Sequence, residues 1–529
     1  MITFKKYTLS LFTVFLMGSC DNSLDEIVYS DVTEQNYTYQ SATAAMGIVY
    51  ANMRTLFGHT NFYMVQETTS DELVMPANPS GWDDGGIFRR LHLHTWNSEN
   101  PQLLNMWNAF YQGVINSNRV IEQLNSGRIP LPDGIAVEAL TGEMRAARAF
   151  FFWLICDNFG DAPLFTTTET DLPDKAPRRA LYDFIVEELT AVIPSLSEET
   201  GAAMHGRFNK WAAKALLANV YLNAEVYTGE AQWNACLSIC DEIIQSNAYQ
   251  LETNYRNIFT TQNENSKEII FAVPFDENRG GGFFVHMFSW HAALRDKRDM
   301  QATPWGSGSA VGIPQFVDTY ALEDKRLADS WLIGPQYALD GTTPLLGSYD
   351  KAGEHLTFTN SLPNGNFAGE SEGYRQNKFD IKINARFDLS NDFPFFRYAQ
   401  ILLMKAECLL RTGNADEAAL LVTEVRKRSF DSETDARVTG FELNADTRYQ
   451  YGYIENYSIV EPGDTAPVPY GAFMDELGWE FAWEAQRRRD NIRFGTFTTK
   501  SWLSHRPQGE SRSVFMIPQV AVNANPKLQ

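Results

Sequence analysis

Hydrophobic residues recur every three or four positions through most of the first half of the chain. In the clearest stretch, Leu103, Met106 and Phe110 share one face. The dipeptide Asn100-Pro101 provides a helix-start signal just before them. This period is that of an amphipathic α-helix. It predicts helices over residues 41–53, 103–124, 136–156, 181–193, 209–227 and 231–245.

Two pairs of these segments have the composition of tightly packed helical hairpins. The first joins 211–218 to 233–243, and the second joins 401–408 to 416–428 across a turn at Gly413. Small residues such as Ala406 and Ala418 allow two helices to approach closely, and stacked pairs bury a continuous face. The design is similar to the tetratricopeptide repeat. It contains no catalytic group and favours a scaffold for binding.

Three segments interrupt the helical pattern. Residues 68–100 hold prolines and glycines together with Trp82 and Trp96, which predicts a long loop with exposed aromatic rings. Residues 276–394 are rich in glycine and carry Trp290 and Trp305, so we expect loops and minor strands there. A shorter interruption, 431–471, contains several tyrosines. Aromatic loops on a helical frame predict a ligand-binding face.

The N-terminus has the layout of a secretory signal. Lys5 and Lys6 precede an apolar run from Tyr7 to Met17, and the segment closes on Gly18-Ser19-Cys20. The run is shorter than the ~20 residues that a membrane-spanning helix needs. A cysteine at this place predicts cleavage after residue 19 and a lipid on Cys20. A chance cysteine beside an ordinary cleavage site is the alternative, because Met17 stands where a lipobox carries leucine.

The amino-acid composition and net charge limit the classes of molecule that this chain can bind. Hydrophobic residues make up 44% of the chain and charged residues 21%, which is typical of a globular protein with a large core. The formal net charge is −22, so most of the surface repels a polyanion and nucleic acid is excluded as a partner. No stretch after Cys20 is long and apolar enough to predict a membrane span.

No catalytic motif is present in the sequence. The nucleophile elbow, Walker A loop, dinucleotide fingerprint and zinc-protease helix are all missing. His92 and His94 could bind a metal from one strand face, but packing and hydrogen bonding are the favoured interpretation. Asp83 and Asp84 could form a glycosidase pair, although neighbouring side chains normally point apart. We therefore expect a binding protein with no cofactor and no metal, not an enzyme.

Cysteines and C-terminal charges have structural interpretations as well. Cys156, Cys236, Cys240 and Cys408 lie in apolar helical stretches, which favours buried thiols over a metal site.

In 476–490, Glu480, Glu484, Arg487 and Arg488 fall at helical spacings of three and four. This pattern predicts an ion-paired helix that closes the fold, with an anion site at the arginines as the alternative.

Four sequence features occur in a fixed order along the chain. Cys20 is followed by Leu24-Asp25, and the segment Arg397–Glu407 reads Arg-Tyr-Ala-Gln-Ile-Leu-Leu-Met-Lys-Ala-Glu. The segment from Glu480 to Gly495 is the third feature. Met516-Ile517-Pro518 with Asn525-Pro526 is the fourth. In this order they resemble the SusD/RagB outer-membrane lipoproteins of Bacteroidetes-type bacteria, and the resemblance covers essentially the whole chain.

The resemblance implies a mainly α, SusD-like fold in which tetratricopeptide-like hairpins carry a loop-rich ligand face with minor strands. It implies a surface protein that stacks glycan on aromatic rings and passes it to a SusC-like TonB-dependent transporter. In the family a Thr/Ser-Asp-Glu stretch precedes a stacking tryptophan, and here Ser70-Asp71-Glu72 precedes Trp82. The ligand-binding residues expected from it are Trp82, Asp83, Trp305, Trp290 and Trp96.

The expected organisation has four parts. They are a signal peptide (1–19), an N-terminal helical part (20–275), a glycine-rich ligand-binding insertion (276–395) and a C-terminal hairpin with the closing helix (396–529). Lipidation of Cys20 would hold the chain at the outer membrane, exposed at the cell surface. The alternative function is a helical-repeat scaffold that assembles an uptake complex for non-sugar cargo such as peptide.

Overall fold

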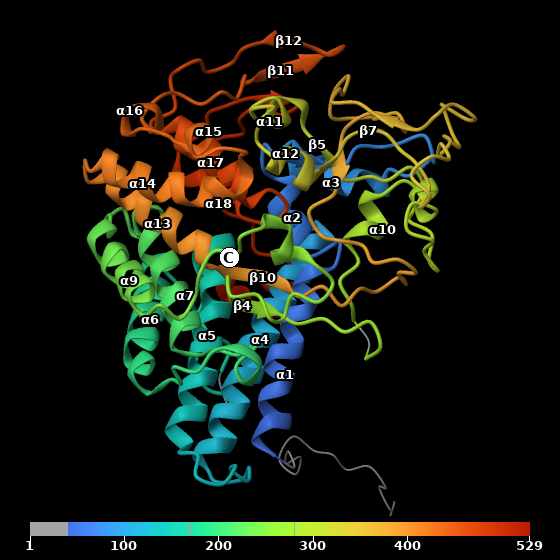
Figure 1. The fold of residues 1–529 in the computed structure, drawn as a ribbon. Helices are drawn as coiled ribbons and strands as arrows, with labels where there is room; N and C mark the ends of the chain where they lie inside the picture. Colours follow the sequence, from blue (N-terminus) through green and yellow to red (C-terminus); the bar gives the residue numbers. More distant parts are fainter. Residues whose placement is uncertain (1–40, 169–170, 280) are drawn as a thin grey trace, which may run out of the picture.

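The computed structural model describes residues 41–168, 171–279 and 281–529, so the predicted signal peptide and Cys20 lie outside the described residues. Long helices form one side of the molecule (Figure 1). The first nine helices of the described chain, long and short, are α1 (Ala42–Arg54), α2 (Phe62–Thr68), α3 (Ile87–His92), α4 (Pro101–Asn125), α5 (Val137–Phe159), α6 (Arg178–Val192), α7 (Lys210–Leu222), α8 (Ala224–Thr228) and α9 (Trp233–Gln245). All six predicted helical segments are therefore confirmed.

The remaining helices are of mixed length, and the strands are short. The helices are α10 (Val285–Ser289), α11 (Pro314–Val317), α12 (Arg326–Ser330), α13 (Tyr398–Arg411), α14 (Ala415–Arg426), α15 (Glu433–Ala436), α16 (Gly440–Leu443), α17 (Gly471–Phe481), α18 (Arg487–Arg493) and α19 (Gln519–Ala524). The strands are β1 (Leu73–Val74), β2 (Ala162–Pro163), β3 (Lys175–Ala176), β4 (Ile269–Val273), β5 (Val311–Gly312), β6 (Trp331–Leu332), β7 (Gly334–Pro335), β8 (Thr357–Phe358), β9 (Arg375–Gln376), β10 (Phe393–Arg397), β11 (Gly452–Glu455), β12 (Ser458–Glu461) and β13 (Trp502–Leu503). The predicted mainly α class is confirmed.

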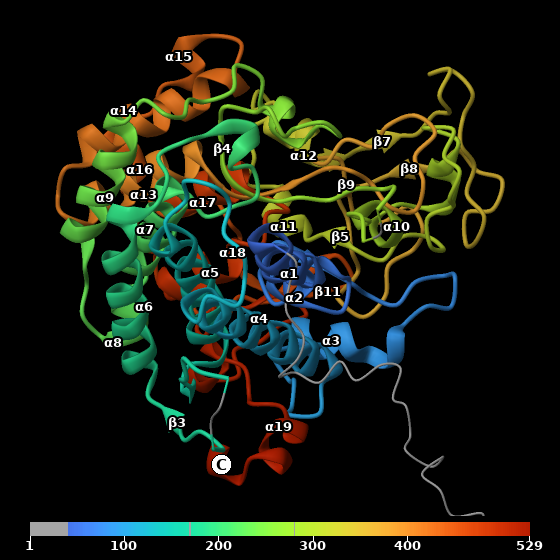
Figure 2. The same ribbon diagram turned by 90° about the horizontal axis from the view of Figure 1, so that it is seen from below.

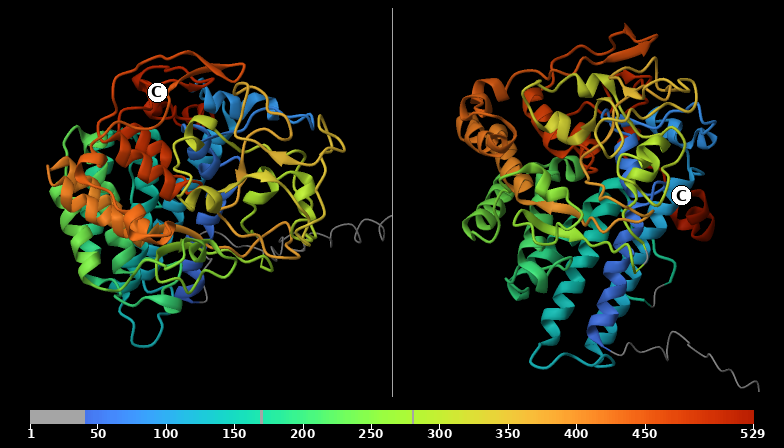
Figure 3. Two further views of the ribbon diagram at one scale, coloured as in Figure 1. Left: turned by 45° about the horizontal axis from the view of Figure 1, so that its top comes forward. Right: turned by 45° about the vertical axis from the view of Figure 1, so that its right-hand side comes forward.

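The two predicted hairpins lie next to each other. Helix α7 packs on α9, α13 packs on α14, and α13 also packs on both α7 and α9. Figure 3 shows these green and orange helices grouped on one side. The close approach of α4 to α5 needs Gly113, because a Cβ there would lie 2.4 Å from the ring of Phe151.

A two-stranded antiparallel ribbon joins the helical side to the glycine-rich segment. Strand β4 pairs with β10, with Val273 opposite Phe393 and Ile269 opposite Arg397, and every residue of both strands is buried. The ribbon brings the two ends of the segment 274–392 together at its base. That segment forms the loop-rich side of the molecule, with β6–β9 and α10 (Figure 2). The predicted division of the chain near residues 275 and 395 falls at this ribbon and stays a prediction.

The stretch 68–100 differs from the predicted irregular loop. Strand β1 pairs antiparallel with β5, and α3 covers Ile87–His92 after a turn at Gly85 and Gly86, whose φ angles are +61° and +70°. Helix α3 is only six residues long. So short a helix gives less than two turns of periodic signal, which explains why the hydrophobic pattern did not reveal it.

The C-terminal charged stretch also differs from the prediction. It is not one helix, because α17 ends at Phe481 and α18 begins at Arg487, with Trp483 and Ala485 in left-handed backbone conformations. The predicted pairs at spacings of three and four are therefore wrong. Arg397 instead reaches both Glu480 (2.6 Å) and Glu484 (2.7 Å) from the start of α13.

These pairs belong to a buried ionic network that ties the parts of the chain together. Glu480 also contacts Arg326 of α12, at 3.2 Å, and Arg428 after α14, at 2.5 Å. Glu484 lies 2.5 Å from Lys378 of the insertion. Pairing of this kind offsets the cost of burying charge.

Within the C-terminal stretch, Arg487 pairs with Asp71 at 2.7 Å and Arg488 donates to the Ser513 carbonyl at 2.8 Å, and both are buried. Their burial supports the structural interpretation over an anion site.

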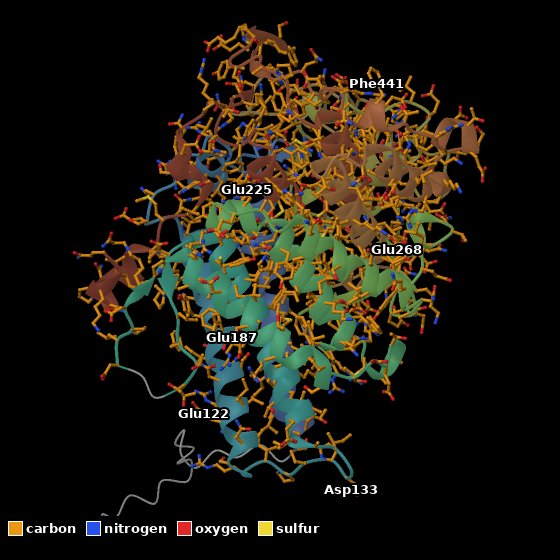
Figure 4. The ribbon with its side chains drawn as sticks, turned by 90° about the vertical axis from the view of Figure 1, so that its left-hand side faces the viewer. Glu122, Asp133, Glu187, Glu225, Glu268 and Phe441 are labelled. Atoms are coloured by element: carbon orange, nitrogen blue, oxygen red, sulfur yellow. The ribbon has the colours of Figure 1, made fainter. Side chains whose placement is uncertain are left out.

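None of the described helices is long and apolar enough to cross a membrane. The helical side carries exposed acidic residues, including Glu187 on α6 and Glu225 on α8 (Figure 4). Phe441, 88% exposed on α16, projects from the same side.

Candidate functional site

Trp305 stands at the centre of a partly exposed aromatic cluster. Its ring is 38% exposed and lies 5.2 Å from His59, 5.9 Å from Phe387 and 6.3 Å from Phe284, measured between ring centroids. Phe387 is 40% exposed, and Phe288 lies beneath, near His59 and Phe284. We call His59, Phe284, Phe288, Trp305 and Phe387 the Trp305 cluster. It offers apolar ring surface to solvent on the loop-rich side.

The backbone around Trp305 fixes the position of its ring. The Trp305 N–H donates to the carbonyl of Met287 at 2.7 Å, and the Trp305 carbonyl accepts from the Gly308 N–H at 3.2 Å. A neighbouring bond from the Ala292 N–H to the Gly306 carbonyl, 2.8 Å, ties the same turn to the segment after α10. The exposed ring is therefore held on a hydrogen-bonded turn, which lowers the entropy cost of binding a ligand against it.

The segment that carries Trp82 touches the turn that carries Trp305. Gly306 has a φ of +57°, and a Cβ at that position would lie 2.4 Å from the Ser80 hydroxyl oxygen. Close by, the amide of Asn78 donates to the Ser309 hydroxyl at 3.1 Å. The structure thus brings together two loops, 78–86 and 303–309, that are more than 200 residues apart in the sequence.

Trp82 and Asp83 lie at the edge of this surface. Trp82 is partly buried against Phe88, with ring centroids 5.9 Å apart. Asp83 is exposed, and its carboxylate accepts a hydrogen bond from the Gly85 N–H at 3.0 Å. The Asp83 carboxylate and part of the Trp82 ring are therefore accessible to a ligand.

Asp84 connects the Trp82 segment to the Trp305 cluster. Asp84 has a left-handed backbone conformation (φ +48°). Burial lowers the pKa of His59, and the negative charge of Asp84 partly offsets this effect. Burial in turn raises the pKa of Asp84. Sequence reasoning chose Asp83 as the polar neighbour. The folded position of His59, earlier in the chain, indicates Asp84 as well.

Trp96 and Trp290 occupy different environments. Each is 1% exposed. Trp96 packs on Phe515, with ring centroids 4.9 Å apart, and the Trp290 indole N–H donates to the carbonyl of Gln376 at 2.7 Å. A ring enclosed on both faces has none left for a ligand. The structure therefore does not support a stacking role for either residue, and the candidate set narrows to Trp82, Asp83 and Trp305.

The histidines and cysteines that suggested metal binding are buried in the core. His92 and His94 are 0% exposed, and burial lowers the pKa of each to about 3, so both are neutral. His94 lies 4.1 Å from His505, ring to ring. Cys156, Cys236, Cys240 and Cys408 are buried free thiols, as predicted. The described residues contain no group of three or more side chains arranged to hold a metal ion.

Comparison with known proteins gives the family. Residues 23–222 match a family described as "Starch-binding associating with outer membrane". Residues 239–515 match the SusD family. The chain is 25% identical to SusD-like protein P25 of Formosa agariphila, over 92% of this chain and 89% of that protein. It is 26% identical to the starch-binding protein SusD of Bacteroides thetaiotaomicron, over 68% and 65%.

Solved structures share the fold. Surface glycan-binding protein A from Bacteroides thetaiotaomicron, solved in complex with laminarihexaose, superposes with a TM-score of 0.66 at 18% identity, covering 92% of this chain and 98% of that one. A laminarin-binding SusD-like protein gives a TM-score of 0.67 at 20% identity, covering 92% and 98%. The fold of these solved structures and the SusD family match over residues 239–515 both agree with the helical architecture described above. The chain belongs to the SusD family.

Proposed function

We propose that this chain is a cell-surface lipoprotein that binds glycan at the Trp305 cluster and delivers it to a TonB-dependent outer-membrane transporter. The observation that carries the proposal is the exposed, positioned ring of Trp305 beside Phe387 and the Trp82 segment. Relatives with this fold include a starch-binding protein and a protein solved with laminarihexaose, which supports a glycan ligand here.

The chemistry of the Trp305 cluster suits a sugar. A sugar ring has flat C–H faces that pack on an aromatic ring, and burial of that apolar area stabilises the complex. Hydroxyl groups around the sugar donate to nearby carboxylates, and Asp83 and Asp84 lie at the edge of the cluster. The net charge of −22 disfavours polyanionic glycans, so we propose a neutral one.

Binding without turnover follows from what the cluster contains. Asp83 is exposed and already accepts a backbone hydrogen bond, and Asp84 faces His59. These two carboxylates are adjacent in the chain and do not flank one ligand position from opposite sides, as a glycosidase pair does.

The first experiment is a panel of neutral and acidic polysaccharides, including starch and laminarin, tested by affinity electrophoresis. Binding to a neutral glycan without released sugar supports the proposal. Binding to none contradicts it, and turnover contradicts the non-enzymatic part.

The anchor and the transporter are tested in cells. A lipid on Cys20 would leave roughly 20 residues before α1, a tether that reaches at most about 70 Å when fully extended. We expect palmitate to label the wild-type chain and not Cys20→Ala, and external protease to digest the wild-type chain on intact cells. Co-purification of a TonB-dependent transporter with the wild-type chain tests the partner. Retained transporter binding without any glycan binding would favour the scaffold function instead.

A further inference from the structure

A second groove with a single exposed aromatic ring lies away from the Trp305 cluster, between α11, the segment 360–362 and the β11–β12 hairpin. It encloses about 260 Å³. Leu362 and Ile454 are its buried apolar residues, Ile459 and Tyr457 are exposed, and Asp318 and Asn360 supply polar groups. We call it the Tyr457 groove. No part of the proposed glycan site includes it.

Tyr457 is held over this groove at a conformational cost. It follows Asn456 at the tip of the β11–β12 hairpin, and φ is +47° for Asn456 and +66° for Tyr457. Ser458 pairs with Glu455, so these two residues form a two-residue hairpin turn that requires positive φ at both positions, where a tyrosine is uncommon. The ring is nevertheless 58% exposed, so its burial does not offset this cost.

Contacts across the groove fix the ring to the insertion. The Tyr457 hydroxyl donates to Glu372 at 2.5 Å, and its N–H donates to the carbonyl of Pro363 at 3.4 Å. The hairpin tip therefore bridges to the glycine-rich segment and carries an exposed aromatic residue with it. This is the arrangement of a preorganised binding surface.

The groove offers acceptor oxygens. The Asn360 amide donates to one carboxylate oxygen of Asp318 at 2.7 Å, and the buried side-chain oxygen of Asn360 has no hydrogen-bond partner among the described residues. Partial burial raises the pKa of Asp318. An aromatic ring with apolar neighbours on one side and a free acceptor on the other matches a sugar, which has apolar C–H faces and hydroxyl donors. The volume lies below the ~300–1,000 Å³ of typical ligand pockets, so the groove has room for about one sugar unit.

We propose that the Tyr457 groove is a second carbohydrate site, which binds a neutral sugar unit of the same polymer that the Trp305 cluster binds. The inference rests on the proposed function. Two sites on one chain raise the affinity for a long glycan through effective concentration, without strengthening the binding of a ligand too short to reach both. The groove would thus select polymer over short fragments.

Three substitutions test the groove. Tyr457→Asn removes the ring but keeps a residue that tolerates the left-handed turn. Tyr457→Phe keeps the ring and removes only the hydrogen bond to Glu372. Asp318→Asn removes the charge at the groove. Phe441→Ala is the control, because that ring is 88% exposed on the helical side and has no part in either site (Figure 4).

Calorimetry compares the polymer with a hexasaccharide of the glycan that the wild-type chain binds, with laminarin and laminarihexaose as the first pair. We expect Tyr457→Asn to weaken polymer binding by about tenfold or more while hexasaccharide binding stays within about twofold. Asp318→Asn should act in the same direction. Tyr457→Phe keeps the ring but loses its bond to Glu372, so it should weaken polymer binding less than Tyr457→Asn does, and Phe441→Ala should bind as the wild-type chain does. Polymer should also protect backbone amides of 452–461 from hydrogen exchange in the Trp305→Ala variant.

The outcomes separate the two proposals. If the wild-type chain binds glycan but Tyr457→Asn binds polymer normally and 452–461 gains no protection, the second site is wrong and the first stands. If the wild-type chain binds no glycan on the panel, both are wrong. If Tyr457→Phe loses as much affinity as Tyr457→Asn, the ring does not bind the sugar by stacking and the second site is wrong as proposed.

Discussion

The guanidinium of Arg397 donates two hydrogen bonds to the carboxylate of Glu484, at 2.7 and 2.8 Å, and both side chains are fully buried. The same guanidinium also contacts Glu268 and Glu480. Arg397 stands at the junction of β10 and α13, whereas Glu484 lies in the break between α17 and α18. The pair therefore fixes the C-terminal helices against the ribbon from which the ligand-bearing insertion emerges.

Removal of one partner should cost more than removal of an exposed ion pair. In Arg397→Met, the carboxylates of Glu480 and Glu484 lose a buried cation, and we expect the free energy of unfolding to fall by about 3–5 kcal/mol. Arg179→Met breaks the exposed pair with Glu230, which solvent screens, and should change the free energy of unfolding far less. Urea unfolding followed by circular dichroism measures both. Equal effects would contradict a structural role for the buried network.

His92 should make the protein sensitive to acid. The Nε2 atom of His92 lies 3.1 Å from the Ser504 hydroxyl oxygen, and burial lowers the pKa of His92 to about 3. The unfolded chain takes up this proton near pH 6.5, so stability is lost as the pH falls from about 6.5 toward 3. Each such histidine contributes up to about 1.4 kcal/mol per pH unit in that window.

His92→Gln tests this contribution, because glutamine keeps a polar group for Ser504 and does not titrate. Between pH 6 and pH 4.5, we expect the variant to lose less unfolding free energy than the wild-type chain, by about 1.4 kcal/mol per pH unit. Urea titrations at several pH values give the two slopes. Identical slopes would mean that His92 is protonated in the folded protein as readily as in the unfolded chain.

Glu67 has the opposite pH dependence. Its carboxyl accepts a hydrogen bond from the Ala485 N–H at 2.7 Å, and burial raises its pKa to about 8. Glu72, beside it, accepts from the Trp483 N–H at 2.7 Å. A folded-state pKa above the unfolded value gives stability that is present at low pH and is lost as the pH rises from about 4.5 to 8.

Glu67→Gln mimics the protonated carboxyl and should remove that loss. Its melting temperature should exceed that of the wild-type chain at pH 8, by an amount equivalent to about 1–3 kcal/mol, and the difference should shrink toward pH 5. Glu187→Gln, an exposed carboxylate on α6, is the control (Figure 4). A Glu67→Gln variant that is less stable at pH 8 than at pH 5, relative to the wild-type chain, would overturn the protonated state of Glu67.

The sequence predicted the helical frame because long helices repeat their apolar positions many times, as α4 does from Leu103 to Leu124. It also identified the two loops that meet at Ser80 and Gly306, because tryptophans among prolines and glycines are visible without a structure. Burial of individual rings was not visible. Trp96 and Trp290 resemble Trp305 in local sequence, but distant residues such as Phe515 and Gln376 enclose them.

The charge spacing in 480–488 predicted the wrong ion pairs for a related reason. Spacings of three and four in 480–488 describe neighbours on a helix, whereas the left-handed residues Trp483 and Ala485 turn these side chains toward Arg397 and Asp71. Trp483 and Ala485 carry side chains that rarely adopt this conformation, so nothing local signals the break. Long-range contacts with Glu67 and Glu72, which accept from the N–H groups of this turn, stabilise it instead.

The most direct test of the central claim is calorimetric titration of Trp305→Ala with the glycan that the wild-type chain binds. Loss of the exposed ring should weaken binding at least about tenfold, since a stacking anchor contributes 1.4 kcal/mol or more. The melting temperature should change little, because the ring is 38% exposed. Phe441→Ala, equally folded, should bind as the wild-type chain does. Wild-type affinity in a folded Trp305→Ala variant would contradict the assignment of the glycan site to the Trp305 cluster.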